Sequence, residues 1–140
     1  MKLSEAIRIG SVSSKQGFRQ YHDSWGDYRC ALGAAYYAVR GHALVSPQNL
    51  HAAFPVLNER LPPNFQCPAN AFCLPPRSGF YTLFGIIITH LNDYHKWDRL
   101  RIADWVASFE KSLESDVCAL ESDVCAVESA TTKEPELCSV

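Results

Sequence analysis

The sequence predicts a mostly helical protein: an all-α, compact bundle of about five helices that occupies residues 1–112. The chain has 140 residues, 47% of them hydrophobic, which is enough for one packed core. Apolar residues recur at spacings of three and four in several segments, as in helices that bury one face. Glycines and prolines stand between these segments, where helices end. Together these observations favour a single helical domain.

The first three predicted helices lie in the N-terminal half, at residues 3–13, 30–40 and 46–54. In the first, Ser4 is the expected N-cap of a segment with an approximate apolar face. The second is rich in alanine, and Gly41 stands where a C-terminal glycine cap belongs. The third begins at Ser46, which is followed by a proline at the first helical position.

The last two predicted helices are residues 80–92 and 97–111. The first of these is strongly apolar, and its β-branched residues Ile86–Ile88 leave a strand followed by a helix as an alternative. Asp98 is the expected N-cap of the second. Two irregular segments remain: an ordered aromatic loop at residues 14–29, and residues 61–79, which hold five of the eight prolines. The proline-rich segment is either an extended connector or a loop held by a covalent or metal link.

A seven-residue repeat, Leu-Glu-Ser-Asp-Val-Cys-Ala, covers residues 113–128. It places apolar residues at the alternating spacings of a coiled-coil seam, namely Leu113, Val117, Leu120, Val124 and Val127. Two heptads are fewer than a coiled coil usually needs. Both a duplication that extends the last helix and a self-associating helix therefore remain open. Residues 129–140 are expected to form a flexible acidic tail.

Charge is distributed unevenly along a chain whose net charge is only −2. Residues 1–109 carry 11 Lys and Arg against 7 Asp and Glu, and residues 110–140 carry 2 against 8. The overall charge gives no general attraction to nucleic acid or to an anionic membrane. Apolar runs are too short to span a bilayer, and the N-terminus does not read as a secretory signal. We therefore expect a cytoplasmic protein whose six cysteines are thiols or metal ligands.

The sharpest pattern is a set of candidate zinc ligands, Cys67, Cys73, His90 and His95. Two thiolates and two imidazoles are a common tetrahedral zinc set. The spacing resembles a Cys2His2 zinc finger at residues 65–95, with Phe65, Tyr81 and Ile87 at the finger's apolar positions. The resemblance departs from the finger pattern in a long Cys–Cys spacing and in an apparent insertion at residues 75–79. The alternatives are unrelated thiols and histidines, or a disulfide between the two cysteines.

Nucleic-acid binding and catalysis are weaker alternatives. The segment before His90 is too apolar for a recognition helix, which presents polar side chains to bases. Lys96, Arg99 and Arg101 are candidate phosphate contacts, although a solvated helix face is the preferred interpretation of these three residues. Cys30 at a helix N-terminus is a conceivable nucleophile. A buried, inert thiol is the preferred interpretation, because no catalytic motif accompanies this cysteine.

Two further stretches carry a family resemblance, Cys30-Ala-Leu-Gly-Ala-Ala and His90-Leu-Asn-Asp-x-x-x-Trp97-x-Arg99-x-x-Ile102-Ala-Asp-Trp105-Val. With Leu3-Ser-Glu-Ala-Ile they resemble a family of small uncharacterised bacterial and phage proteins, over roughly residues 3–107. The resemblance implies a helical domain in which a cysteine pair precedes the His-Leu-Asn-Asp segment, and it implies no activity. We therefore expect a non-enzymatic interaction or accessory protein with a structural zinc, possible partners being a protein of a larger assembly or a second copy of the chain. A weak nucleic-acid-binding regulator and a small cysteine-dependent enzyme are the alternatives.

Overall fold

The computed structural model describes residues 1–19, 21–22, 27–44, 46–73 and 82–128, with side chains up to residue 116. The chain divides into two units, Met1–Ser108 and Phe109–Val140. The described residues are mostly helical, which confirms the predicted class at that level. Short strands accompany the helices, and the sequence had offered only the one within residues 80–92, as an alternative. The described part contains no helix with the length and hydropathy required to cross a membrane.

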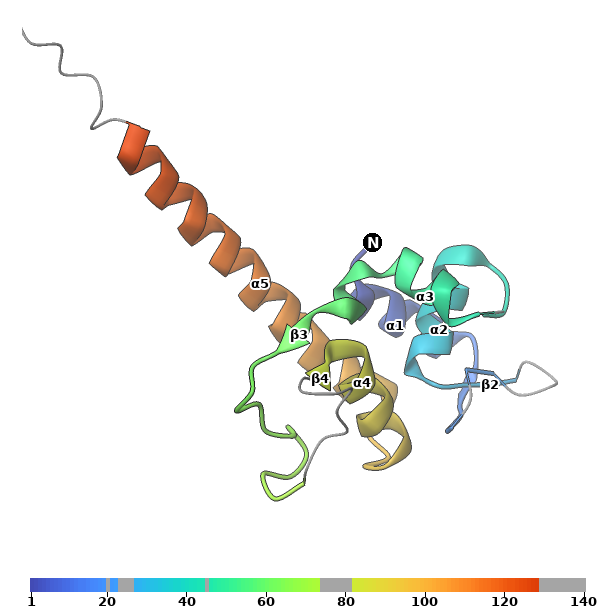
Figure 1. Ribbon diagram of the computed structural model, residues 1–140. Coiled ribbons are helices and arrows are strands. Elements are labelled where there is room, and N and C mark those ends of the chain that lie inside the picture. The colour runs from blue at the N-terminus through green and yellow to red at the C-terminus, as the bar shows by residue number, and fades with distance from the viewer. Residues whose placement is uncertain (20, 23–26, 45, 74–81, 129–140) are drawn as a thin grey trace, which may run out of the picture. The chain divides into compact units, whose positions relative to one another are not determined.

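Figure 1 shows the order of elements in the first unit. The helices are α1 (Leu3–Val12), α2 (Ala31–Arg40), α3 (Pro47–Ala53), the 3-10 helix η1 (Pro55–Asn58), α4 (Phe84–Asp93) and the first turns of α5 (Arg99–Glu128). Gly41 adopts the left-handed conformation at the C-cap of α2, with φ 72°, as predicted. The amide of Arg101 donates to Asp98 Oδ1 at 2.8 Å, which confirms the predicted N-cap of α5. The prediction for Ser4 was wrong: it is buried inside α1, and Lys2 occupies the N-cap position.

Two pairs of two-residue strands tie the irregular segments down. β1 (Lys15–Gln16) pairs in parallel with β2 (Tyr28–Arg29), so the two ends of the aromatic loop lie side by side. β3 (Arg60–Leu61) pairs antiparallel with β4 (Thr82–Leu83), which leads directly into α4. The strand-then-helix alternative for residues 80–92 therefore describes this segment, although the strand lies before the isoleucines. The second pair of strands brackets the proline-rich segment and brings its two ends together.

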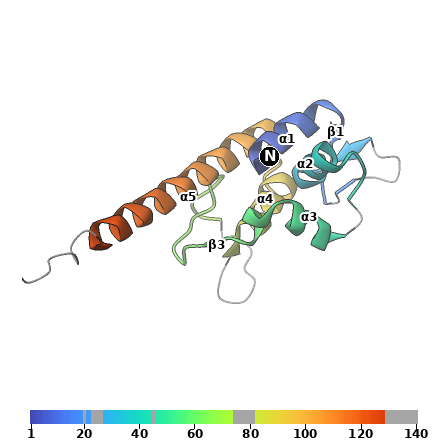
Figure 2. The ribbon, with the colours of Figure 1, turned by 90° about the horizontal axis from the view of Figure 1, so that it is seen from above.

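The core of the first unit forms where α2 packs against α1 and α4 (Figure 2). Buried side chains of α3, η1 and the first turns of α5 complete it. Its largest fully buried apolar side chains are Leu3, Ile7, Leu50, Leu57, Phe84, Ile87, Ile88, Leu91, Ile102 and Val106. The backbones of α1 and α2 come into contact at Gly10, where a built Cβ would lie 2.1 Å from the carbonyl oxygen of Ala34. Glycine at this position permits the two helices to pack in contact.

The second unit consists, in its described part, of the remainder of α5, whose backbone is helical to Glu128. The repeat at residues 113–128 is therefore helical, in continuity with the last helix. The boundary at Ser108 falls inside α5, four residues before the one expected from the sequence. Leu113 is half-buried, and the side chains of Val117, Leu120, Val124 and Val127 lie outside the described residues. The expected tail at residues 129–140 also lies outside them.

Candidate metal centre

The four predicted ligands come together from two parts of the first unit. Cys67 and Cys73 lie in the loop that follows β3, His90 lies in the last turn of α4, and His95 lies in the turn before α5. One ligand atom from each residue lies within 4.8 Å of the corresponding atom of every other. The structure thus confirms that these side chains form one cluster with the donor set of a metal site.

The distances inside the cluster match the scale of a tetrahedral zinc site. Cys67 Sγ lies 3.3 Å from His95 Nε2, and Cys73 Sγ lies 3.2 Å from His90 Nε2. Ordinary Zn–S and Zn–N bond lengths put sulfur and nitrogen about 3.6 Å apart across a tetrahedral edge. An ion would therefore require these two pairs to separate by a few tenths of an ångström and the widest pair to close.

Two successive turns aim the cysteine sulfurs at one place. The amide of Asn70 donates to the carbonyl of Cys67 at 3.2 Å, and the amide of Cys73 donates to the carbonyl of Asn70 at 3.0 Å. The Asn70 side chain also accepts from the amide of Phe72 at 2.9 Å, an Asx turn that stiffens the second half of the loop. These local hydrogen bonds fold the chain between the two cysteines, so that the sulfur of Cys73 lies near that of Cys67.

The histidine pair depends on how α4 ends. The amides of Tyr94 and His95 both donate to the carbonyl of His90, at 2.9 and 3.3 Å, so α4 ends in a turn that is closed by an i→i−5 hydrogen bond. Lys96 then takes a positive φ of 54°, which turns the chain towards α5. The rings of His90 and His95 consequently meet edge to face, with centroids 4.8 Å apart. Each ring presents its Nε2 atom to a different cysteine.

Burial and the neighbouring ligands shift the pKa values of two of the four residues, His90 and Cys73. Cys67 is buried, and the other three ligands are partly exposed. Burial lowers the pKa of His90, and neighbouring His95 lowers it further, so the imidazole is readily neutral. Desolvation raises the pKa of Cys73, and the adjacent Cys67 raises it too. A bound cation would offset the repulsion between the two thiolates, which is the reason that metal binding to such clusters releases protons.

The surroundings differ from those of a DNA-reading finger. Of the finger's apolar positions, Ile87 is fully buried, Phe65 packs against Trp105 with ring centroids 6.4 Å apart, and Tyr81 lies outside the described residues. Phe84 also packs on Trp105, at 5.1 Å. α4 therefore uses its apolar side chains to fill the core of the first unit. This burial agrees with the sequence argument against a recognition helix.

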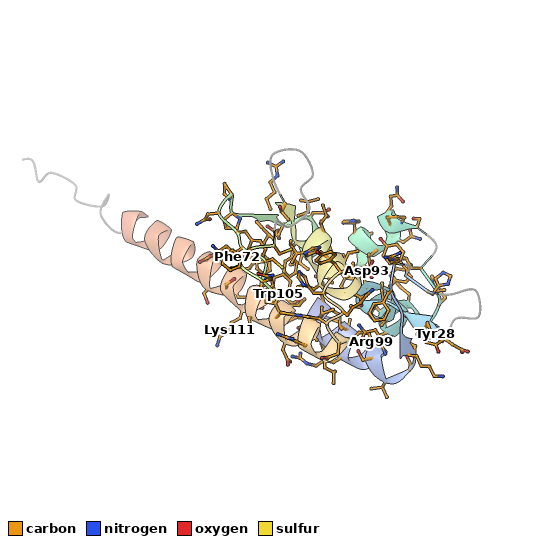
Figure 3. All side chains as sticks on the ribbon, turned by 90° about the horizontal axis from the view of Figure 1, so that it is seen from below. Tyr28, Phe72, Asp93, Arg99, Trp105 and Lys111 are labelled. Carbon is orange, nitrogen blue, oxygen red and sulfur yellow. The ribbon has the colours of Figure 1, made fainter. Side chains whose placement is uncertain are left out.

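The three candidate phosphate contacts have separate partners. Lys96 Nζ lies 4.1 Å from the centre of the Phe18 ring, and the Arg101 guanidinium lies 3.9 Å from that of Trp97. The prediction for Arg99 was wrong, because its side chain is buried against the end of α1 (Figure 3). It donates to the carbonyl of Ser11 at 3.1 Å, to Ser14 Oγ at 2.9 Å and to the carbonyl of Ser14. Arg99 thus joins the C-terminus of α1 to the N-terminus of α5.

Cys30 does not have the environment of a nucleophile. It is only 9% exposed, and its sulfur accepts a hydrogen bond from the amide of Gly33 at 3.4 Å as the N-cap of α2. Burial raises the pKa of the Cys30 thiol to about 11, outweighing these amide hydrogen bonds. The group is therefore a protonated thiol at neutral pH.

This protonation state predicts slow alkylation of Cys30. At pH 8 iodoacetamide is expected to modify it at least about 100-fold more slowly than an ordinary cysteine thiol, because its thiolate fraction is correspondingly small. Peptide mass spectrometry after timed labelling measures the rate at this residue alone. The same protein unfolded in guanidinium serves as the control and should label Cys30 at the ordinary rate. Fast labelling of the folded protein would contradict this interpretation and revive the enzyme alternative.

The sequence did not reveal the role of Asn92, which is the last residue of the predicted helix at residues 80–92. Asn92 is 1% exposed, and its Nδ2 donates to the carbonyl of Gly17 at 3.1 Å and to Asp93 Oδ1 at 2.6 Å. Its Oδ1 accepts from the amide of Ala31 and from Gln16 Nε2, both at 3.3 Å. One amide therefore connects the end of α4, two residues from His90, to β1 and α2. The signal in the sequence was only an unusual polar residue on the apolar side of a helix.

Asn92→Ala is accordingly expected to destabilise the protein by about 2–4 kcal/mol, because it leaves a buried amide and a buried carbonyl without their partner. Urea denaturation followed by circular dichroism measures this loss. Thr89→Ala is the matched control on the same helix, since the exposed Thr89 hydroxyl bonds only to the carbonyl of Gly85 within α4. Equal stabilities of the two variants would show that the Asn92 network contributes nothing.

The geometry of the cluster itself identifies it as a candidate metal site. Its donor set, its distances and the turns that build it are all consistent with a closed four-ligand site. Comparison of the chain with protein-family models, with curated proteins and with solved structures finds no match.

Proposed function

We propose that Cys67, Cys73, His90 and His95 bind one zinc ion with a structural role. The observation that carries this proposal is the convergence of two sulfurs and two imidazole nitrogens within 4.8 Å of one another. Two thiolates and two imidazoles suit zinc better than calcium or magnesium, which prefer oxygen ligands. Four protein ligands leave no open position for a substrate or an activated water, which favours structure over catalysis. Elemental analysis of the purified protein is expected to find about one zinc per chain.

The ion would hold the proline-rich loop on the end of α4. After β3, the described loop to Cys73 has no helix or strand, and its backbone hydrogen bonds form turns within the loop. Cys67 is the most buried side chain in this part of the loop, so the metal and one small thiol would anchor it. A zinc site would stabilise this loop in the way that a larger apolar core stabilises other segments of a protein.

For the whole chain, the proposed function is that of a non-enzymatic accessory protein that binds another protein or a second copy of itself. The heptad spacing of Leu113, Val117 and Leu120 on a helical backbone supports an association role. The two cysteine ligands must stay reduced to bind a metal. The reducing cytoplasm keeps thiols reduced, and it is the compartment we propose. The family resemblance supports a place in a bacterial or phage assembly.

Sedimentation equilibrium tests the association role. The full chain is expected to show a mass that rises with concentration, and Val117→Asp with Val124→Asp should return it to the monomer mass, because charges at seam positions oppose pairing. Ser115→Ala with Ser122→Ala, at positions outside the seam, is the matched control and should associate like the wild type. A monomeric wild type at all concentrations would contradict self-association and leave another protein as the partner.

A further inference from the structure

The metal centre is flanked by two aromatic side chains that the fold leaves exposed. Phe72, which precedes Cys73, is 95% exposed, and Tyr94, which precedes His95, is 69% exposed. Large aromatic side chains are seldom presented to water to this extent, and exposed ones often mark interaction sites. Neither residue contributes to the core described above. Their position beside the ligands means that the same local structure fixes both aromatics and the cluster.

The backbone of Phe72 and the ring of Tyr94 are held in place. The Phe72 amide is bonded to Asn70 Oδ1 in the turn between the two cysteines, on the loop seen in Figure 3. The Tyr94 ring stacks on the His90 ring, with centroids 5.1 Å apart and planes 10° from parallel. One face of Tyr94 is therefore covered by a metal ligand while the ring remains largely open to solvent. A fixed, open aromatic face loses little conformational entropy when a flat partner stacks on it.

Two basic groups follow Tyr94 in the chain, Lys96 in the turn after α4 and Arg101 near the start of α5. Lys96 follows His95, and its Nζ lies over the partly exposed ring of Phe18. Arg101 lies over Trp97, and a cation over a ring keeps N–H groups free for an anion. Two aspartates of this segment keep their negative charge, although Asp93 Oδ1 accepts from the amide of Arg19 and Asp98 Oδ1 accepts from that of Arg101. Lys96 and Arg101 are therefore the two groups here that would contact phosphates.

We propose that Phe18, Phe72, Tyr94, Lys96 and Arg101 form a binding surface for single-stranded nucleic acid. Proteins that bind single strands without strong sequence preference combine aromatic platforms for bases with cations for phosphates. In a duplex the base faces are stacked on one another, so exposed aromatics favour the single strand. The excess of 11 basic over 7 acidic residues in residues 1–109 agrees with this partner. The proposal rests on the proposed metal centre, which would hold Phe72 and Tyr94 in place.

Fluorescence anisotropy with the full-length, zinc-loaded protein tests the surface. The probe is a labelled oligothymidine of about 12 nucleotides, titrated at low salt beside a labelled duplex of equal length. We expect saturable binding that is tighter for the single strand and weakens as salt is raised. Phe72→Ala and Tyr94→Ala should each weaken binding by about 5- to 150-fold, the cost of one lost base stack. Lys96→Gln and Arg101→Gln should each reduce the logarithmic salt slope by about 0.7.

Val12→Ala is the matched control, since Val12 is 90% exposed but lies at the end of α1. It should bind like the wild type, and Phe72→Trp should also retain binding. Equal affinity of Phe72→Ala and Val12→Ala, or duplex binding as tight as single-strand binding, would overturn the surface. A protein that holds one zinc per chain and binds no oligonucleotide would overturn it while the metal centre stands. Oligonucleotide binding that depends on Phe72 in a zinc-free protein would support the surface and overturn the metal centre instead.

Discussion

Cys67→Ser combined with His90→Ala is expected to abolish zinc binding and to lower the melting temperature by about 10 °C or more. The double variant leaves one sulfur and one imidazole, too few to hold the ion at physiological concentrations. Classical zinc fingers unfold completely without metal. The effect here should be smaller, because the core that surrounds Ile7, Ile87 and Ile102 does not depend on the ion. Several kcal/mol of lost stability corresponds to a shift of this size for a domain of about 100 residues.

Elemental analysis and thermal unfolding with and without a chelator measure the two effects. The chelator should lower the melting temperature of the wild type to that of the double variant and should leave the variant unchanged. His42→Ala is the matched control, since His42 is exposed, bonds to the neighbouring carbonyl of Ala43, meets the Tyr36 ring edge to face and is not one of the four clustered ligands. This control should retain about one zinc per chain. Zinc retained by the double variant, or absent from the wild type, would show that the cluster is not the metal site.

Gly10→Ala is expected to destabilise the protein by about 3 kcal/mol or more. The new Cβ would lie 2.1 Å from the carbonyl oxygen and 2.4 Å from the carbonyl carbon of Ala34. These are backbone atoms of α2, so no side-chain rotation relieves the clash, and the two helices must separate. Alanine is favoured over glycine in a helix by only about 1 kcal/mol, which does not compensate. The substitution therefore acts through packing and against helix propensity.

Urea denaturation measures this change, and Gly41→Ala gives the comparison. A Cβ at Gly41 meets nothing within 4 Å, but the residue has a φ of 72°. That variant should lose only about 1 kcal/mol, the cost of placing a non-glycine residue in the left-handed region. A Gly10→Ala variant as stable as the wild type would mean that α1 and α2 are not packed in backbone contact.

Much of the helical organisation follows from local signals. Gly41 ends α2 and Asp98 begins α5 because a left-handed glycine and a side-chain cap need only their own neighbours along the chain. The error at Ser4 has the same origin. A serine caps a helix only if the helix starts immediately after it, and α1 already starts at Leu3, the residue before Ser4. Strand β1 escaped prediction because two residues have no period to detect. Its existence depends on β2, which lies 13 positions along the chain.

The metal cluster could be predicted because its residue types are rare and chemically distinctive. Cysteine and histidine at these spacings point to zinc whether or not the intervening chain is understood. The turn at Asn70 and the turn that follows His90 were not predictable, although these two turns bring the four ligand atoms together. Arg99 shows the opposite case. A basic residue beside Lys96 and Arg101 looks like part of a basic surface until the end of α1 surrounds it.

The sequence by itself determined the mostly helical class, the caps at Gly41 and Asp98, and the identity of the candidate metal ligands. Each of these depends on residues close together in the chain or on side chains with a narrow chemistry. Only the tertiary structure decided that Asn92 and Arg99 are buried connectors, that Gly10 is a contact point, and that Phe72 and Tyr94 stand exposed beside the cluster. Burial is a property of distant segments packed together, so the same polar or aromatic residue reads alike in sequence whether it is inside or outside.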